Sequence, residues 1–119
     1  MIYEIALLPV HKEQVEQFRQ AFAEVAPLLT RAKGYRGHTL AQGIESPGVF
    51  NLIVQWQTLE DHTPVFEASD DHQRFMLGLQ DYFSQEPTVY HVEGPEFAKE
   101  TLKKASRFGE IPASQESNG

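Results

Sequence analysis

The side chains best suited to chemistry in this sequence are its five histidines, since it contains no cysteine. An imidazole titrates near neutral pH and can accept or donate a proton there. No two of the histidines have a helical metal-ligand spacing such as i, i+4, so the sequence lends no support to a metal site. The histidines placed within predicted elements are the acid–base candidates, namely His38, His62 and His91.

Each candidate histidine also has a purely structural interpretation. His62 falls in the first turn of a predicted helix, where a hydrogen bond to the adjacent strand or to a second subunit is the alternative to catalysis. His38 and His91 lie in predicted strands, where an imidazole either faces a cavity or makes a cross-strand or interface hydrogen bond. His11 and His72 lie at the starts of elements and are expected to be solvated.

Aromatic, amide and acidic residues are further candidates for a functional site beside the histidines. Four aromatic residues either line an apolar pocket or, as is commoner at such spacings, belong to the core: Trp56, Phe66, Phe75 and Tyr82. Asn51 lies on the same side of its strand as Gln55, and a buried amide there needs a substrate or a subunit interface as its partner. One set of acidic residues is expected to be helix-start charges: Glu60, Asp61, Glu67, Asp70 and Asp71.

The spacing of apolar side chains predicts the elements that position these residues. Short segments rich in β-forming residues predict strands over 2–8, 35–42, 49–57 and 88–93. Apolar residues three and four apart predict an amphipathic helix from about Lys12 to Gly34, bent at Pro27. Thr58 begins a short helical piece through Phe66, and Ser69 or Asp70 caps a second piece, so this later helix is predicted to be broken in two.

The resulting order, β-α-β-β-α-β, predicts an α+β fold: a ferredoxin-like antiparallel sheet with helices on one face. The strands carry apolar residues on both faces, and two helices cover only one of them, which favours a homodimer. We expect one domain over residues 1–94 and a tail over 95–119. The tail is predicted to be a weak helix over 96–108 followed by a mobile segment over 110–119.

Size and charge exclude several classes of function. The chain of 119 residues has a net charge of −7, and the excess lies before Gly94, which argues against nucleic acid and anionic membranes as partners. No apolar run approaches the ~18 residues of a membrane span, and no secretory signal is visible, so a cytoplasmic protein is expected. Glycine-rich phosphate loops and G-x-S-x-G are also missing from the sequence.

A spaced pattern runs through the first 93 residues and consists of the segments 33–35, 50–56, 58–62 and 89–91 with Phe66, Ser69 and Phe75. This pattern resembles the antibiotic biosynthesis monooxygenase (ABM) domain. That family belongs to the dimeric α+β barrels, in which two ferredoxin-like sheets pack face to face. The resemblance covers roughly residues 2–93 and leaves the tail outside.

The resemblance implies oxidation of a small aromatic, quinol or anthrone-like substrate by O2 without flavin, haem or metal. Such chemistry needs an apolar pocket, a base and donors for a developing oxyanion. The resemblance places His62 and His91 near this pocket, as candidates for the base. Haem-degrading relatives use an Asn on the first strand and a Trp and a His on the later helical segment. Here the first strand has no Asn and Trp56 ends a strand, so haem degradation is not expected.

Two hypotheses follow for the function. The first is a cofactor-independent monooxygenase. The second is a non-catalytic dimeric barrel that binds a small hydrophobic ligand or protects against a reactive metabolite. Both need a pocket, and only the first needs a titrating group beside it.

Overall fold

The computed structural model describes residues 1–96. The predicted weak helix of the tail, apart from Glu96, and the predicted mobile segment lie outside the described residues. The elements follow the predicted order. Strands are β1 (Ile2–Pro9), β2 (Tyr35–Gln42), β3 (Val49–Trp56) and β4 (Thr88–Glu93), and helices are η1 (Lys12–Gln14), α1 (Val15–Thr30), η2 (Asp61–Phe66), α2 (Asp70–Leu79) and η3 (Gln80–Tyr82).

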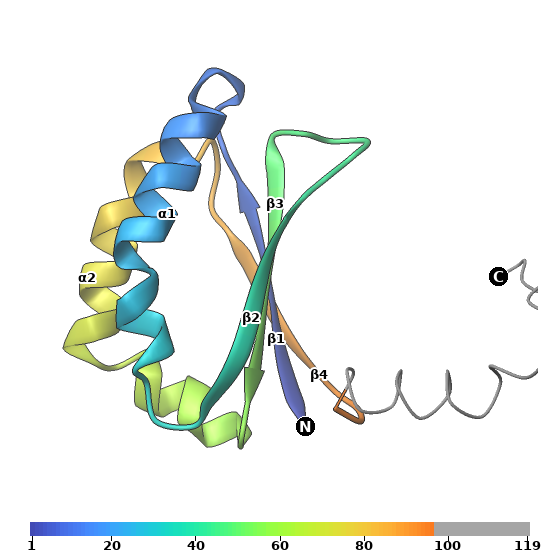
Figure 1. The fold of residues 1–119 in the computed structure, drawn as a ribbon, viewed down its shortest axis with the longest axis vertical. Helices are drawn as coiled ribbons and strands as arrows, with labels where there is room; N and C mark the ends of the chain where they lie inside the picture. Colours follow the sequence, from blue (N-terminus) through green and yellow to red (C-terminus); the bar gives the residue numbers. More distant parts are fainter. Residues whose placement is uncertain (97–119) are drawn as a thin grey trace, which may run out of the picture.

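The four strands form one antiparallel sheet in the order β2-β3-β1-β4, with helices α1 and α2 on one face (Figure 1). This confirms the ferredoxin-like α+β prediction. Strand β1 pairs Glu4 with Val54 on one side and with His91 on the other. Directly paired residues project to the same face of a sheet, so Glu4 and His91 both lie on the helix-covered face.

Helix α1 carries the predicted apolar stripe, and Phe18, Phe22 and Leu29 are buried against the sheet. Pro27 lies inside the helix, which continues to Thr30. The chain then turns through Gly34, whose φ of +82° is a conformation that glycine adopts at little cost. A side chain at this position would overlap the carboxyl group of Asp61, so Gly34 lets the start of η2 approach the end of α1 closely.

The second helical region is broken, as predicted. Its first piece, η2, is a wide π-type turn in which Thr63 has extended backbone angles (φ −129°, ψ 113°). Proline disfavours the helical conformation in the residue before it, so Pro64 accounts for the extended Thr63. The oxygen of Thr58 accepts a hydrogen bond from the Asp61 N–H at 3.1 Å, and Ser69 caps α2 in the same way.

The core lies between the helices and the inner face of the sheet, where four residues of β3 are buried: Phe50, Leu52, Val54 and Trp56. The other face of the sheet is covered by no element of residues 1–96. Alternate β3 residues project there, and Tyr90 and Val92 of β4 are 49% and 46% exposed on it. Within the described part of the chain, no helix is both long and apolar enough to cross a membrane.

Candidate functional site

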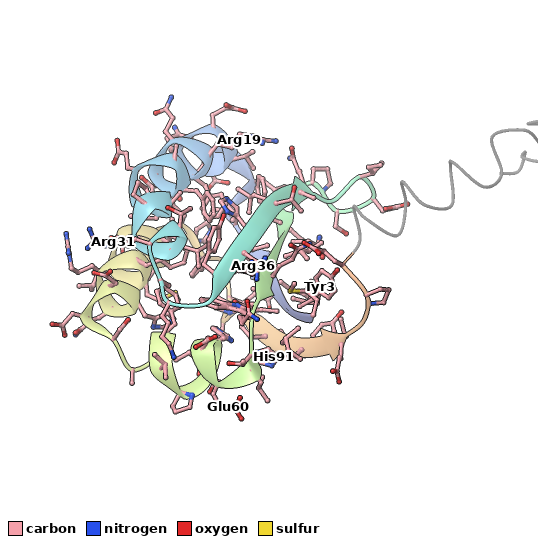
Figure 2. All side chains as sticks on the ribbon, turned by 60° about the horizontal axis from the view of Figure 1, so that its bottom comes forward. Tyr3, Arg19, Arg31, Arg36, Glu60 and His91 are labelled. Atoms are coloured by element: carbon pink, nitrogen blue, oxygen red, sulfur yellow. The ribbon has the colours of Figure 1, made fainter. Side chains whose placement is uncertain are left out.

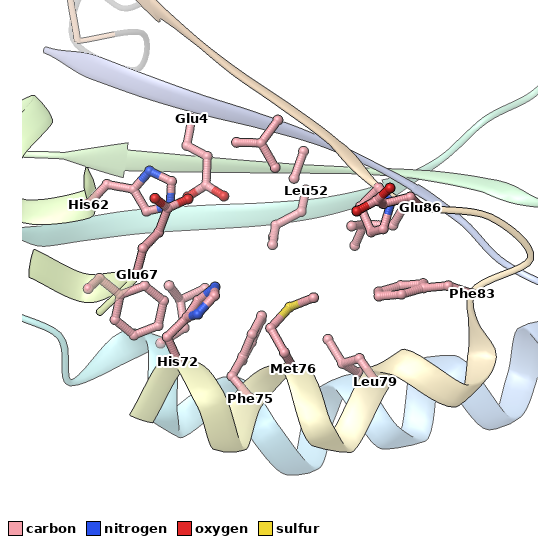
Figure 3. Close-up of a pocket in the computed structure, with 16 residues that line it drawn as sticks. Glu4, Leu52, His62, Glu67, His72, Phe75, Met76, Leu79, Phe83 and Glu86 are labelled. Atoms are coloured by element: carbon pink, nitrogen blue, oxygen red, sulfur yellow. The ribbon is translucent and has the colours of Figure 1, made fainter. Parts of the chain in front are cut away.

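A cavity of about 220 Å³ lies between the inner face of the sheet and α2 (Figure 3). Apolar side chains form most of its wall, including Leu52, Phe66, Phe75, Met76, Leu79 and Phe83. Glu4, His62, Glu67 and His72 gather at one end, and Glu86 lies near the other. The cavity therefore combines an apolar body with one polar, titratable end.

Glu4 is the central residue of the polar end. It projects from β1 on the same face as Ala6 and Leu8 and is only 7% exposed. Its Oε1 accepts a hydrogen bond of 3.0 Å from the indole N–H of Trp56. Burial raises the pKa of Glu4 to about 7, the Trp56 hydrogen bond acts in the opposite direction, and the nearby charge of Glu67 raises it further.

His62 lies beside Glu4 and is only 2% exposed. Its ring stacks on Trp56, with ring centroids 5.2 Å apart and planes at 23°. Its Nε2 lies 3.3 Å from Glu4 Oε1 and 3.7 Å from a carboxylate oxygen of Glu67. Burial lowers the pKa of His62 to about 4, against the opposing effect of Glu67, so the ring is neutral at pH 7. Burial thus favours the uncharged forms of both Glu4 and His62.

His91 lies behind His62 as seen from the cavity. Its Nε2 is 2.8 Å from Nδ1 of His62, which is hydrogen-bond distance. It projects from β4 opposite Glu4 and is half-buried, and it does not line the cavity. Glu4, His62 and His91 therefore form a continuous row of polar contacts, of 3.3 Å and 2.8 Å, that begins at the cavity wall and ends near the edge of the sheet.

The start of η2 is held in place by the residues around it. Asp61 is buried, and its carboxylate lies 3.4 Å from the Lys33 ammonium group, which extends from the α1–β2 connection. Arg31, at the end of α1, makes two hydrogen bonds of 2.8 Å to Asp71 in α2. Two of the acidic residues expected to be helix-start charges therefore connect elements: Asp71 joins the end of α1 to α2, and Asp61 joins the α1–β2 connection to η2.

The predicted site residues divide into three groups. His62, Phe66 and Phe75 line the cavity, and Trp56 and His91 contact His62 from behind. The third group, His38, Tyr82 and Asn51, lies outside the cavity lining. His38 shares a 2.6 Å hydrogen bond with the Tyr35 hydroxyl and packs against Phe22.

Tyr82 and Asn51 are the other two predicted residues that lie outside the cavity. The Tyr82 ring packs edge-on against Phe18, 6.3 Å between centroids, in the core. Asn51 belongs to the alternate set of β3 residues that project to the uncovered face of the sheet. It therefore cannot contact a ligand in this cavity within one chain.

Sequence reasoning missed Glu4, Glu67 and His72 as site residues. His72 was expected to be solvated, and this was wrong: it is half-buried, lines the cavity and packs edge-on against Phe66, with burial lowering its pKa. Glu67 was expected to be a helix-start charge only. The sequence did contain an indication for Glu4. It is the one charged residue in the first strand, and it alternates in step with Ala6 and Leu8, so it projects to the same face as these apolar residues.

Within residues 1–96, no group of three histidine, aspartate or glutamate side chains is arranged to hold a metal ion. The titratable groups here lie in a row from Glu4 through His62 to His91, with Glu67 and His72 beside it, and not around a common centre. What this arrangement offers is proton transfer beside an apolar cavity.

The fold and this site define a ferredoxin-like α+β domain with a cavity suited to a small apolar molecule. The family model described as Antibiotic biosynthesis monooxygenase matches residues 1–77, and the chain belongs to this family. The curated protein YczJ of Bacillus subtilis strain 168, itself uncharacterized, is 34% identical over 93 residues, 78% of this chain and 98% of YczJ.

Solved structures give the same result for the fold. A Bordetella bronchiseptica protein assigned to the antibiotic biosynthesis monooxygenases is 32% identical, with a TM-score of 0.76 over 80% of this chain and 97% of the other. A mutant of SnoaB, a cofactor-independent oxygenase from Streptomyces nogalater, has a TM-score of 0.67 over 80% of this chain and 93% of the other. At 16% identity, the likeness to SnoaB shows the fold alone.

Proposed function

We propose that this protein is a cofactor-independent monooxygenase that oxidises a small aromatic, quinol or anthrone-like substrate with O2. The observation that carries the proposal is the buried acid–base chain at one end of an apolar cavity. Glu4, His62 and His91 form that chain, and Trp56, Phe66 and Phe75 contact it or line the cavity next to it. Family membership supports the same class of reaction.

The chemistry requires little more than proton transfer from the protein. Removing a proton from an anthrone-like CH2 group leaves a carbanion that gives electrons to O2. The new C–O bond forms a hydroperoxide, which loses a second C–H proton as its O–O bond breaks. The overall products are a ketone and one water molecule. The protein supplies an acid–base group and an apolar, water-poor site for the carbanion.

The cavity also restricts the substrate. Its volume of about 220 Å³ lies below the ~300–1,000 Å³ of typical ligand sites, which favours molecules of two or three fused rings. Three glutamates line it, and no lysine or arginine among residues 1–96 does so. An anionic ligand would face these carboxylates without a compensating cation, so we infer that the substrate is uncharged.

We also propose that the protein works as a homodimer, joined through the uncovered face of the sheet. The residues of β1, β3 and β4 that project to this face carry no charge: Tyr3, Ile5, Leu7, Val49, Asn51, Ile53, Gln55, Thr88, Tyr90 and Val92. Two copies of a chain with net charge −7 can approach through such a face without burying like charges. A second copy of this chain is therefore the partner that fits it.

A second function, ligand binding without catalysis, is favoured by one observation. A His62 with a pKa of about 4 is a weak base at neutral pH, and an apolar cavity by itself explains ligand binding. The two functions differ in whether oxygen is consumed.

Oxygen uptake by chelator-treated protein tests the proposal directly. Anthrone and naphthalene-1,4-diol are the neutral substrates, and 1,4-dihydroxynaphthalene-2-carboxylate is the anionic counterpart of the diol. We expect uptake above the protein-free rate with a neutral substrate and much less with the carboxylate. Binding of the neutral compounds without oxygen uptake would support the binding function instead. Equal turnover of the diol and its carboxylate would contradict the inferred preference for uncharged substrates.

A further inference from the structure

We propose that Glu4 is the residue that takes the proton from the bound substrate, held in position by Trp56 and His62. This inference rests on the proposed function, because it assigns the acid–base step of that reaction to one atom. It differs from the expectation that a histidine is the base. The argument comes from the accessibility of individual atoms at the polar end of the cavity.

The two oxygens of the Glu4 carboxylate have different surroundings. Oε1 accepts the indole N–H of Trp56 at 3.0 Å and lies 3.3 Å from Nε2 of His62. Among residues 1–96, Oε2 has no hydrogen-bond partner. Figure 3 shows the carboxylate at the cavity wall, with His62 on one side and open cavity on the other. One oxygen therefore anchors the group, and the other is directed to the space that a substrate would fill.

His62 lacks a nitrogen that is free to act on a ligand. Its Nε2 faces Glu4 and its Nδ1 is engaged by His91 at 2.8 Å, while Trp56 covers one face of the ring. His91 does not reach the cavity; Figure 2 shows it at the edge of the sheet, beside η2. His62 is thus a positioning residue for Glu4, and His91 fixes the orientation of the His62 ring.

The charged and titratable groups facing Glu4 come from three elements or their ends, and a fourth supplies a neutral ring. His62 and Glu67 belong to the η2 region, His91 to β4 and His72 to α2, and the neutral indole of Trp56 comes from β3. With a pKa of about 7, Glu4 exists in both protonation states near neutral pH. A group of this kind can act as base and then as acid within one turnover.

The proton steps balance within the reaction. The substrate C–H bond breaks, its electron pair stays on carbon, and an O–H bond forms at Glu4 Oε2. The carbanion is oxidised by O2, a C–O bond forms, and Glu4 returns its proton to the terminal peroxide oxygen. Glu4 then takes the remaining C–H proton while the O–O bond breaks. The hydroxide that leaves receives this proton and departs as water, so Glu4 is regenerated.

The first test is the variant Glu4→Gln, which keeps an oxygen for the Trp56 hydrogen bond and removes the basic function. We expect oxygen uptake with anthrone to fall by about 10²–10⁴-fold, the usual range for loss of general-base catalysis. Binding of anthrone, followed by Trp56 fluorescence, should change little. The matched control is Glu93→Gln, which removes an exposed carboxylate from β4 outside the cavity lining and should keep the parent rate.

A second measurement separates this inference from the proposed function. Under nitrogen in D2O, a base at the cavity wall should speed exchange of the acidic C1–H of 2-tetralone, followed by proton NMR. We expect Glu4→Gln to lose about 10²–10⁴-fold of this exchange rate. Exchange without oxygen uptake would refute the oxygenase function and support Glu4 as base. Oxygen uptake that Glu4→Gln leaves unchanged would refute the role of Glu4 and keep the oxygenase.

Two further variants keep the test decisive if Glu4→Gln does not fold. Glu4→Asp retains a carboxyl group, so the rise of rate with pH should remain. The rate itself should fall, because the shorter side chain holds the carboxylate farther from the substrate. His62→Phe keeps a ring on Trp56 and removes the nitrogen 3.3 Å from Oε1, so the midpoint of the pH profile should move away from that of the parent. A Glu4→Asp variant that keeps the parent rate, or a His62→Phe variant that keeps the parent pH midpoint, would overturn the proposal.

Discussion

Glu4 and Trp56 join the start of the chain to the end of β3 by a buried hydrogen bond of 3.0 Å between the indole N–H and a carboxylate oxygen. The two residues lie on neighbouring strands, since Ile2 is the direct pairing partner of Trp56. The indole thereby supplies a donor to a carboxylate that burial would otherwise keep protonated over a wider pH range. Its ring at the same time supports His62 by stacking.

Replacing Trp56 with Phe removes this donor. We expect the pKa of Glu4 to rise above about 7, because the lost hydrogen bond favours the ionised form. The pH midpoint of oxygen uptake should move upward, and stability should fall by about 1–3 kcal/mol because a buried acceptor loses its partner. Denaturant unfolding and a pH–rate profile measure the two effects. Phe50→Leu, on the same strand, should lower stability and leave the pH midpoint unchanged; a shift in both variants would contradict the assignment.

The stability of the protein should depend on pH through two opposing groups. The pKa of Glu4 is raised from 4.5 to about 7 in the folded state, so its stabilising contribution is complete below 4.5 and is lost as pH rises through 7. The pKa of His62 is lowered from 6.5 to about 4, so its contribution is complete above 6.5 and is lost as pH falls through 4. Each effect has an upper limit of roughly 3 kcal/mol, so they largely cancel between pH 4.5 and 6.5.

Glu4→Gln should expose the dependence that is due to His62. In this variant the free energy of unfolding should rise with pH between 4 and 6.5. Burial also lowers the pKa of His72, so this residue acts in the same direction. The parent protein should show a flatter profile over that range. Urea unfolding at several pH values compares them. Parallel profiles for the two proteins would show that Glu4 does not hold a raised pKa.

Gly34→Ala should destabilise the fold. The backbone at Gly34 has φ +82°, and an added Cβ would overlap the Asp61 carboxyl group. The left-handed conformation alone costs about 1–2 kcal/mol for a residue with a Cβ, and the displaced Asp61 adds to this. Thermal unfolding measures the loss. Gly94→Ala, where an added Cβ meets nothing within 4 Å, is the control and should unfold like the parent.

The proposed dimer predicts a particular effect of charge on the uncovered sheet face. Light scattering should give about twice 13.5 kDa for the parent protein. Ile53→Glu places a charge at the middle of this face, opposite Ile5, and should give a monomer. Gln73→Glu adds the same charge on the exposed surface of α2 and should remain a dimer. A parent mass of 13.5 kDa at micromolar concentration would refute the proposal.

Purified protein is expected to carry no stoichiometric metal, flavin or haem. The sequence lacks cysteine and helical histidine pairs, and no metal-ligand group of three occurs within residues 1–96. Elemental analysis and an absorption spectrum check this, and oxygen uptake should be unaffected by a chelator. One equivalent of a metal that is needed for turnover would contradict the cofactor-independent mechanism.

The order of the elements could be predicted because it depends on local patterns. Apolar residues three and four apart, such as Phe18 and Phe22, define a helix wherever the chain places them. The break before α2 was also predicted, because Thr58 and Ser69 are helix-capping residues that start two separate helical pieces. These features depend on neighbours within a few positions, so the sequence alone contains them.

The site could be predicted only in part, because it depends on pairing between distant strands. The amino-acid pattern indicated that His62 begins a helical piece and that His91 lies in the last strand, but it did not indicate that both adjoin Glu4. That contact follows from the register of β1 with β4 and from the wide turn of η2. Alternation groups Glu4 with Ala6 and Leu8, and Asn51 with Ile53, but a register slip of one residue would reverse the face to which every side chain projects. The tertiary structure therefore decided which of these groups faces the cavity.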